Sequence, residues 1–434
     1  MKKLIAISVV FALVAGAAFA VDLGGTVIGT VKVLQGDTGK DAAGDANKVT
    51  SDAGLSRVRI DGSGEANENF GGFFRADSGA FYGNAWWKPI DQLKFLLGSN
   101  GYDGFIGKEG VTGWGFHQTA TDTGVTTSEG GAGIWNDDIY GYGIKYRHAF
   151  FEGGGDGGNA AYLFITPMDM LGINVIIPFF GQKETADAFK KAVVQIDFKM
   201  EGVGNIALTY VGGLGNKDAT DPVVLKGDDV PAVPGAGKWK VDPDTGALTW
   251  EADAGSTGKY YLFSDGAAVS DPASIFVYYG GSFGDLSIDF GLGYTMASKQ
   301  GDETVAAPIG IGLGVKYAME TLGVKFRSVV DLPMHKSQNM KVLAEVLPYF
   351  VLGDNLAAYV GIGLGMLMPS ANQKDIGGDA AKSYTGWQFN PYLVVGEEWG
   401  AKFLVGVKAW SDGMKHGDST VTNWAVPVAL IVSF

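Results

Sequence analysis

The sequence predicts an all-β fold, namely a transmembrane antiparallel β-barrel of about 16 to 18 strands. Three observations predict it: apolar residues recur at every second position, the extended segments are about ten residues long, and their connections alternate between tight and long. A tilted strand of that length crosses the hydrocarbon layer of a bilayer, with one face toward lipid and the other toward an enclosed lumen. After residue 20, no apolar run is long enough for a transmembrane helix, so only a closed sheet could span a membrane.

The alternation is strict in three segments, residues 191–200, 286–294 and 356–366. In the first, one face carries Ala192, Val194, Ile196, Phe198 and Met200, and the other carries Lys191, Val193, Gln195, Asp197 and Lys199. In the other two, an apolar face opposes a face rich in glycine. A soluble β-sandwich also alternates and remains the alternative, but the strand length favours a barrel.

The connections give the strand number. The tight ones are expected at residues 66–69, 89–91, 167–170, 201–204, 283–285, 318–321, 353–355 and 396–399. The long ones include residues 35–53, 100–137, 214–257, 331–340, 369–383 and 412–421. Eight tight turns join sixteen strands, and a free strand at each end brings the number to about 18. Residues 139–180 are ambiguous, because the glycines at 153–158 fit either a turn or a loop.

The first twenty residues have the pattern of a secretory signal peptide. Lys2 and Lys3 precede an apolar run at residues 4–17, and Ala18-Phe19-Ala20 supplies the small residues of a cleavage site. A bilayer-spanning helix is the alternative, but the run is short and a polar, glycine-rich stretch follows it. We therefore expect residues 1–20 to be removed and residues 21–434 to form a single barrel with long extracellular loops.

Composition excludes several function classes. The formal net charge is −14, and loss of Lys2 and Lys3 with the leader makes it −16, which argues against nucleic acid as a partner. Cysteine is absent, so neither disulfides nor thiolate metal sites are expected. The four histidines, His117, His148, His335 and His416, have no metal-ligand spacing and no evident catalytic partner. We expect no metal, no cofactor and no enzymatic activity.

The last eleven residues alternate to the end of the chain. The outward set consists of Trp424, Val426, Val428, Leu430, Val432 and the terminal Phe434. This ending resembles the C-terminal strand of bacterial outer-membrane β-barrel proteins of the general porin type. The resemblance implies that the barrel-assembly machinery reads Trp424, Val428, Leu430, Val432 and Phe434, and that outer-membrane lipids surround the chain. The final strand of a secreted sandwich is the alternative.

Aromatic residues suggest interfacial girdles. Trp86 and Trp87 precede a predicted turn at Pro89, as in porin hairpins, and Trp399, Trp410 and Trp424 could belong to the same girdles. A ligand-stacking role is a second interpretation for Trp114 and Trp135.

Charged residues at alternate positions of the N-terminal strands predict a basic inner wall. A charge that faces lipid at mid-depth costs about 2–4 kcal/mol for Arg or Lys, so these side chains should face the lumen. The predicted basic patch consists of Lys32, Arg57, Arg59, Arg75 and Lys94. By the same count, Lys325, Arg327, Lys402 and Lys408 face inward as well.

Residues 100–137 follow the predicted fifth strand, and this position resembles that of the constriction loop of general porins. The resemblance implies that the segment folds into the lumen and that Asp103, Lys108 and Glu109 line the constriction opposite the basic wall. The Pro-Glu-Phe-Gly-Gly signature of that loop is absent. The alternative is a surface loop, with the arginines paired locally to Asp61 and Asp77.

The function expected from these features is a water-filled channel for passive diffusion of small hydrophilic solutes, trimeric by analogy with porins. Two alternatives stay open. The chain could be a surface adhesin or structural barrel, or a substrate-selective outer-membrane transporter for compounds such as sugars or fatty acids.

Overall fold

The computed structural model describes residues 21–38, 49–77, 80–99, 105–106, 160–179, 185–216, 237–241, 248–252, 270–271, 273–300, 303–305, 309–334, 340–368, 383–396, 400–411 and 422–433. The expected signal peptide at residues 1–20, the ambiguous glycines at 153–158, all four histidines, Trp114, Trp135 and Trp399 lie outside these ranges.

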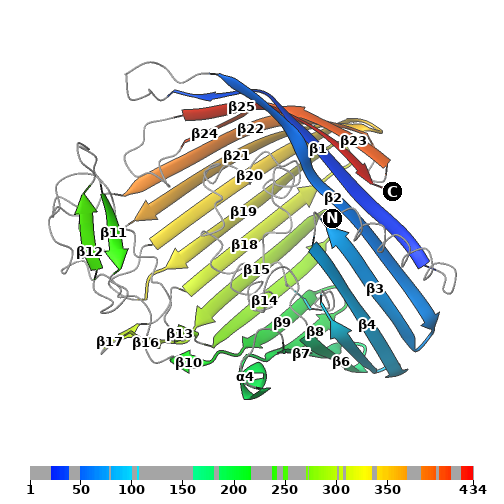
Figure 1. Cartoon of the computed structure of the whole chain (residues 1–434). Helices are drawn as coiled ribbons and strands as arrows, with labels where there is room; N and C mark the ends of the chain where they lie inside the picture. Colours follow the sequence, from blue (N-terminus) through cyan, green and yellow to red (C-terminus); the bar gives the residue numbers. More distant parts are fainter. Residues whose placement is uncertain are drawn as a thin grey trace, which may run out of the picture.

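The described strands form one closed antiparallel barrel (Figure 1). In order around the wall they are β1 (Val21–Asp37), β2 (Thr50–Asn67), β3 (Phe70–Asp77), β4 (Ala80–Ile90), β5 (Leu93–Gly98), β6 (Ala160–Met168), β7 (Leu171–Pro178), β8 (Val193–Met200), β9 (Gly204–Val211), β14 (Ser274–Phe283), β15 (Leu286–Thr295), β18 (Ile309–Ala318), β19 (Leu322–Leu332), β20 (Met340–Gly353), β21 (Leu356–Met368), β22 (Tyr384–Gly396), β23 (Gly400–Gly406) with β24 (Lys408–Ser411), and β25 (Thr422–Ser433). The ring closes because β1 pairs with both β2 and β25.

The strand number agrees with the sequence prediction. The sheet has 19 hydrogen-bonded segments, and β23 and β24 both pair with β22 and β25. These two segments are therefore two parts of one strand, and the described wall has 18 strands. All-β architecture and the antiparallel barrel are both confirmed.

All eight predicted tight turns join consecutive strands at one end of the barrel, which we call the turn end. At Gly396 the backbone has a positive φ of 119°, and a Cβ there would lie 2.0 Å from the carbonyl oxygen of Ala401. Only glycine fits such a position without strain. In the β4–β5 turn, Lys88 donates a hydrogen bond of 2.7 Å to Asp91, and this bond lowers the pKa of the Asp91 carboxyl.

The opposite end, the loop end, carries the longer connections with one exception. Only residues 78–79 separate β3 from β4, because Asp77 and Ala80 are already paired. The excursion predicted at residues 214–257 extends further, since β10 (Gly215–Asn216) pairs with β13 (Ser270–Asp271). Between them lies the hairpin of β11 (Gly237–Val241) and β12 (Leu248–Ala252), which stands apart from the wall in Figure 1. β16 (Ser298–Gln300) and β17 (Glu303–Val305) form another hairpin.

A single short helix, α4 (Thr185–Lys190), precedes β8 in the described part of the chain and was not predicted. Among the residues that the structure describes, no helix is both long and apolar enough to cross a bilayer.

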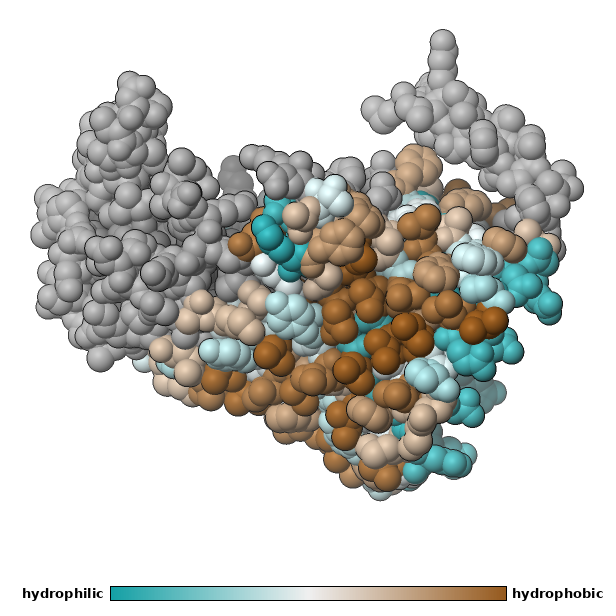
Figure 2. All heavy atoms as spheres, turned by 90° about the horizontal axis from the view of Figure 1, so that it is seen from below, coloured by the Kyte–Doolittle hydropathy of each residue, from teal (hydrophilic) through white to brown (hydrophobic). Residues whose placement is uncertain are grey.

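The outer face of the wall is apolar, as the alternation predicts. In the three segments with strict alternation, the large apolar residues point outward and are partly or largely exposed, with Leu364 at 60%, Phe198 at 46% and Phe290 at 38%. Figure 2 shows a continuous brown area over the lower face, with hydrophilic residues gathered along one edge. An exposed apolar area of this extent is unusual for a protein in water and is expected where lipid is the solvent.

The tryptophans divide between the two faces. Trp87 faces outward near the turn end and stacks between Phe70 and Phe95, with ring centroids 6.2 and 5.5 Å away. Trp410, in contrast, is buried on the inner face, so its assignment to an interfacial girdle is wrong. The reason is register: Trp410 is paired with the inward-facing Gln388 of β22.

Candidate functional site

The inner wall is the candidate functional site, and its middle level divides into two halves. The charged half comprises inner-face residues of β19, β20, β22, β24 and β1 to β3, namely Arg327, Glu345, Gln388, Lys408, Lys32, Arg59, Asp61 and Arg75. The other half, which we call the uncharged half after these residues, comprises inner-face residues of β5 to β8 and β14, namely Leu96, Tyr162, Ile176, Val193, Gln195 and Phe276. The buried Asp197 lies on the same face of β8, two positions from Gln195 toward the turn end. The two halves face each other, since β8 and β24 lie nine strands apart in either direction around the ring.

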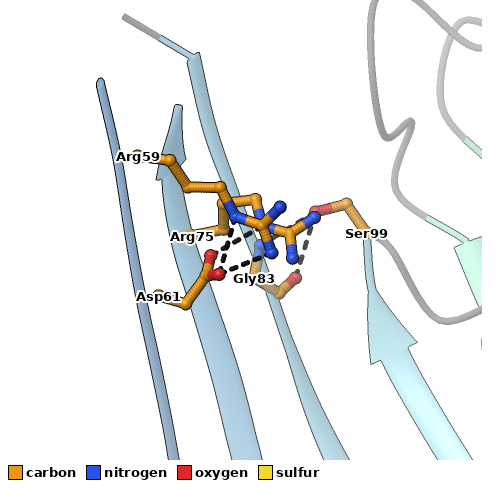
Figure 3. A network of polar contacts seen from close by, with 5 residues as sticks. All are labelled: Arg59, Asp61, Arg75, Gly83 and Ser99. Carbon is orange, nitrogen blue, oxygen red and sulfur yellow. Dashed lines mark hydrogen bonds and ion pairs between the residues drawn. The ribbon is translucent and has the colours of Figure 1, made fainter. Parts of the chain in front are cut away.

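Arg59, Asp61 and Arg75 form an ion-pair cluster on β2 and β3 (Figure 3). Arg59 Nε donates to Asp61 over 2.6 Å and Arg75 Nε donates to the other carboxylate oxygen over 2.7 Å. All three side chains are 22–26% exposed. The two arginines therefore share one carboxylate, as the local-pairing alternative expected for Asp61, and the cluster keeps one net positive charge.

The other predicted basic residues take different places. Arg57 is on β2 in phase with Arg59, but its side chain lies outside the described part of the structure. Lys94 faces inward close to the turn end, with its ammonium 4.8 Å from the centroid of the Trp86 ring. Lys32 is buried on the inner face of β1 and is an electrostatic neighbour of Lys408. The structure thus brings Arg59 and Arg75 together around Asp61, whereas Lys94 lies near the turn end and Lys32 lies on β1.

A second cluster is buried in the charged half. Arg327 donates hydrogen bonds of 2.9 and 2.7 Å, from Nε and from a terminal nitrogen, to one oxygen of Glu345, and Gln388 donates to the other oxygen over 3.3 Å. Arg327 and Glu345 are each 2% exposed, and Lys408 is 1% exposed beside them. The ammonium of Lys408 lies 4.9 Å from the centroid of the Trp410 ring. Sequence alternation placed Arg327 and Lys408 inward but did not identify Glu345 or Gln388 as their neighbours.

Three tyrosines stack along the inner face at the turn end of the charged half. Tyr349, Tyr359 and Tyr392 come from adjacent strands β20, β21 and β22, with centroid separations of 5.6 and 4.9 Å. Both faces of the central Tyr359 ring are covered by its neighbours. The stack therefore fixes the wall and leaves this ring no free face for a ligand.

At the end of β5 the chain turns toward the lumen. Gly98 has a φ of 129°, and a Cβ there would lie 2.2 Å from the carbonyl oxygen of Gly83. Ser99 is then held by Gly83, whose N–H donates to Ser99 Oγ over 2.8 Å (Figure 3). The inward-facing Asn84 donates to the carbonyl oxygen of Ser99 over 3.0 Å. These contacts hold Ser99 in place at the loop end of β5.

Phe105 and Ile106, the next described residues, lie against the uncharged half of the inner wall. The Phe105 ring contacts Phe164 edge-on at 6.1 Å and packs with Leu96, Tyr162 and other buried residues. The side-chain amide of Gln195 bonds to the backbone of Ile106, accepting from its N–H over 2.8 Å and donating to its carbonyl oxygen over 2.9 Å. The start of the segment predicted to enter the lumen is thus placed inside it. Asp103, Lys108 and Glu109 lie outside the described residues, so their constriction role stays a prediction.

The last strand carries the predicted outward set. Trp424, Val428, Leu430 and Val432 alternate with the inward Ala425 and Ala429 on β25, which is paired on both sides. Phe434 lies outside the described residues. Recognition of this strand by an assembly machinery stays a prediction.

Within the described ranges, no three His, Cys, Asp or Glu side chains group closely enough to hold a metal ion.

No protein-family model matches the sequence, and no curated protein is similar to it in sequence. Solved structures of similar fold include the anion-selective porin from Comamonas acidovorans, at 12% identity and a TM-score of 0.45, covering 95% of this chain and 99% of that one. OpdQ of Pseudomonas aeruginosa is 8% identical, with a TM-score of 0.45 and coverage of 95% and 97%. The in-vitro folded outer membrane protein OmpT of Vibrio cholerae is 11% identical, with a TM-score of 0.43 and coverage of 95% and 97%.

At such identities the likeness concerns the fold alone. By its own closed ring of strands, with an apolar outer face and charged residues on the inner face, the chain has the architecture of outer-membrane β-barrels.

Proposed function

We propose that this protein is an outer-membrane channel for passive diffusion of small hydrophilic solutes. The observation that carries the proposal is the division of the wall. Charged side chains such as Arg59, Asp61 and Arg75 face the interior of a closed ring, while the exterior is apolar. Charged residues in such a position require water, and an enclosed column of water that crosses a bilayer is a pore.

The arrangement of charges suggests how solutes would be selected. Asp61 holds both arginines close to the wall, so their charges act at a fixed position instead of swinging across the lumen. On β8, five strands from β3 around the ring, the inner face carries the uncharged Gln195 and, two positions further on, the buried Asp197. The field of these fixed charges would orient dipolar solutes and favour them over apolar ones, which cannot replace the hydrogen bonds of the displaced water.

The proposal includes the cell biology that the sequence predicts. The chain would be exported, cleaved after Ala20, inserted by the barrel-assembly machinery with the help of its last strand, and assembled as a homotrimer without enzymatic activity. Heat-modifiable migration of membrane-extracted protein tests the folded barrel, and cross-linking in the membrane tests the trimer.

Planar-bilayer recording tests the channel. Stepwise increases in conductance on addition of the purified protein support it, and a sealed bilayer at all concentrations contradicts it and favours a surface adhesin or structural barrel. Liposome swelling separates the remaining alternative. Uptake of neutral hydrophilic solutes through a passive pore follows their size and does not saturate, whereas saturable uptake that discriminates between such solutes of equal size indicates a substrate-selective transporter.

A further inference from the structure

The ammonium group of Lys408 on β24 is buried and makes no hydrogen bond. The side chain is 1% exposed, and Nζ has no hydrogen-bond partner in the described structure. The face of the Trp410 ring, whose centroid lies 4.9 Å away, attracts the charge but accepts no conventional hydrogen bond. An ammonium has three N–H donors, so the bonds that water would form with them outside the wall are missing here.

The nearby carboxylate of Glu345 is already bonded to other groups. One of its oxygens accepts two hydrogen bonds from Arg327, and the other accepts one from Gln388. Glu345 acts on Lys408 as an opposite charge, whereas Lys32 acts on it as a like charge. Among Arg327, Lys408, Lys32 and Glu345, one negative charge is thus set against three positive charges.

The strands on either side of Lys408 do not complete its hydrogen bonds. The register of β24 with β22 sets Asn390 beside it, but Asn390 Oδ1 is also buried and unbonded, so the two side chains do not bond to each other. On β25, Lys408 pairs with Ala425, whose side chain has no polar atom. Asn423, two positions from Ala425, has a buried amide nitrogen that is likewise unbonded. This part of the wall therefore combines unbonded N–H donors with a surplus of positive charge.

The chemistry of these groups indicates which ligand would complete them. A buried charge is unfavourable without a counter-charge, and water supplies hydrogen bonds but no charge. A small monovalent anion supplies both, because it accepts from N–H groups in any direction. A carboxylate or a phosphate has several oxygens that each need donors, and Lys408 and Asn390 are only 1% and 5% exposed, which favours a small ion.

We propose that Lys408 binds a small monovalent anion, such as chloride, on the inner face of β24. The anion accepts hydrogen bonds from the ammonium and balances the positive charge that Glu345 leaves uncompensated. This site goes beyond the proposed channel function and does not depend on it.

Thermal unfolding of the folded barrel in a non-ionic detergent tests the site. A ligand that binds only the folded state raises its stability with the logarithm of the ligand concentration above the dissociation constant. At constant ionic strength and with the same cation, the wild-type midpoint should be higher in chloride than in gluconate, an organic anion too large for a buried site. It should also rise with each further increase in the share of chloride. Lys408→Met should lose this dependence.

The substitution has a matched control. Methionine keeps much of the apolar length of lysine without its charge, and Arg327 and Glu345 keep their ion pair in Lys408→Met. Lys94 is another inner-face lysine beside a tryptophan ring, with its ammonium 4.8 Å from the centroid of Trp86. Lys94→Met should retain the wild-type response to chloride, which separates the site from general effects of salt on the barrel.

Crystals grown in bromide locate the anion directly. The anomalous signal of bromide should show a peak at hydrogen-bond distance from Lys408 Nζ in the wild type and no peak there in Lys408→Met. If Lys408→Met does not fold, the wild-type response to chloride and the position of the bromide decide the question together.

Three results would overturn the site. They are a wild-type midpoint that does not respond to chloride, an equal response in wild type and Lys408→Met, and the absence of a bromide peak at Lys408. A peak at Lys408 without any effect of halide on unfolding means binding at crystal concentration only and overturns the site as well. None of these measurements uses current, so their outcome is separate from that of the channel proposal.

Discussion

In the charged half of the inner wall, Glu345 receives hydrogen bonds from side chains of two other wall strands, β19 and β22, whereas in the uncharged half Gln195 bonds to backbone that is far away in the sequence. Both residues are buried and both are fully engaged. The difference lies in where their hydrogen-bond partners come from. Side chains of the barrel wall bond to Glu345, whereas Gln195 bonds to the backbone of Ile106, which is not part of a wall strand.

This difference assigns separate tasks to the two halves. Ion pairs across adjacent strands keep charge at fixed positions and so give the lumen its field. Amide and apolar side chains instead provide a surface against which another segment of the chain can pack. A peptide group can satisfy the hydrogen bonds of such an amide without bringing a charge into the lumen. Changes in the charged half should alter ion preference, and changes in the uncharged half should leave it unaltered.

The largest expected effect is that of Glu345→Gln. It leaves Arg327 and Lys408 buried without their carboxylate, which should lower the free energy of unfolding by about 3–5 kcal/mol. Denaturant titration of the folded barrel measures it. The double variant Arg327→Met with Glu345→Gln should lose less than the sum of the single losses, and strict additivity would show that the two side chains do not interact.

Ile176→Ala tests the uncharged half in the same way. Ile176 is 2% exposed within the apolar cluster around Phe105, so its truncation should cost about 2–5 kcal/mol through lost contacts and a cavity. The reversal potential in a salt gradient should stay at the wild-type value. A clear change of ion preference in this variant would break the proposed division of tasks.

Asp61→Asn should alter ion preference with little loss of stability. Removing one negative charge beside Arg59 and Arg75 raises the positive charge of the cluster and should shift the reversal potential toward anions. Because the cluster is partly exposed, the stability change should stay within about 1 kcal/mol. Arg75→Gln is the matched variant and should shift the potential toward cations; equal potentials in both would remove the cluster from the selectivity mechanism.

The smallest expected effect belongs to Lys94→Met. Its ammonium interacts with the face of the Trp86 ring, and the lost contact should cost about 0.5–1 kcal/mol. The thermal unfolding midpoint of the barrel reports this loss, and the same substitution in a Trp86→Leu background should cost less. An equal cost in both backgrounds would exclude the ring contact as its source.

The sequence predicted the fold better than it predicted the site. Alternation and turn residues located all eight tight turns and the face to which Arg59, Arg75, Arg327 and Lys408 belong, since both signals are local. The partner of each inward group depends on register between strands, which local patterns do not carry. Gln388 lies 43 positions from Glu345, so sequence reasoning missed that contact.

Trp410, wrongly assigned to an interfacial girdle, also shows that local sequence patterns do not give the register between strands. A tryptophan near a strand end suits an interface girdle by type, but the pairing of β24 with β22 turns it inward. The contact of Gln195 with Ile106 joins residues even further apart in the sequence, since Gln195 is on β8 and Ile106 follows β5. Its one signal in the sequence is an uncharged amide at an inward position, which many strands share.

Cysteine accessibility on a single strand tests the central claim most directly, and the natural chain has no cysteine to interfere. Ser63 and Ile60 are both exposed residues of β2, the first on the inner face with Asp61 and the second on the outer face. In a conducting bilayer, a charged, membrane-impermeant thiol reagent should modify Ser63→Cys and reduce the current, and should leave Ile60→Cys unmodified. Modification of Ile60→Cys with Ser63→Cys untouched, or equal modification of both, would contradict a water-filled interior within a lipid-facing wall.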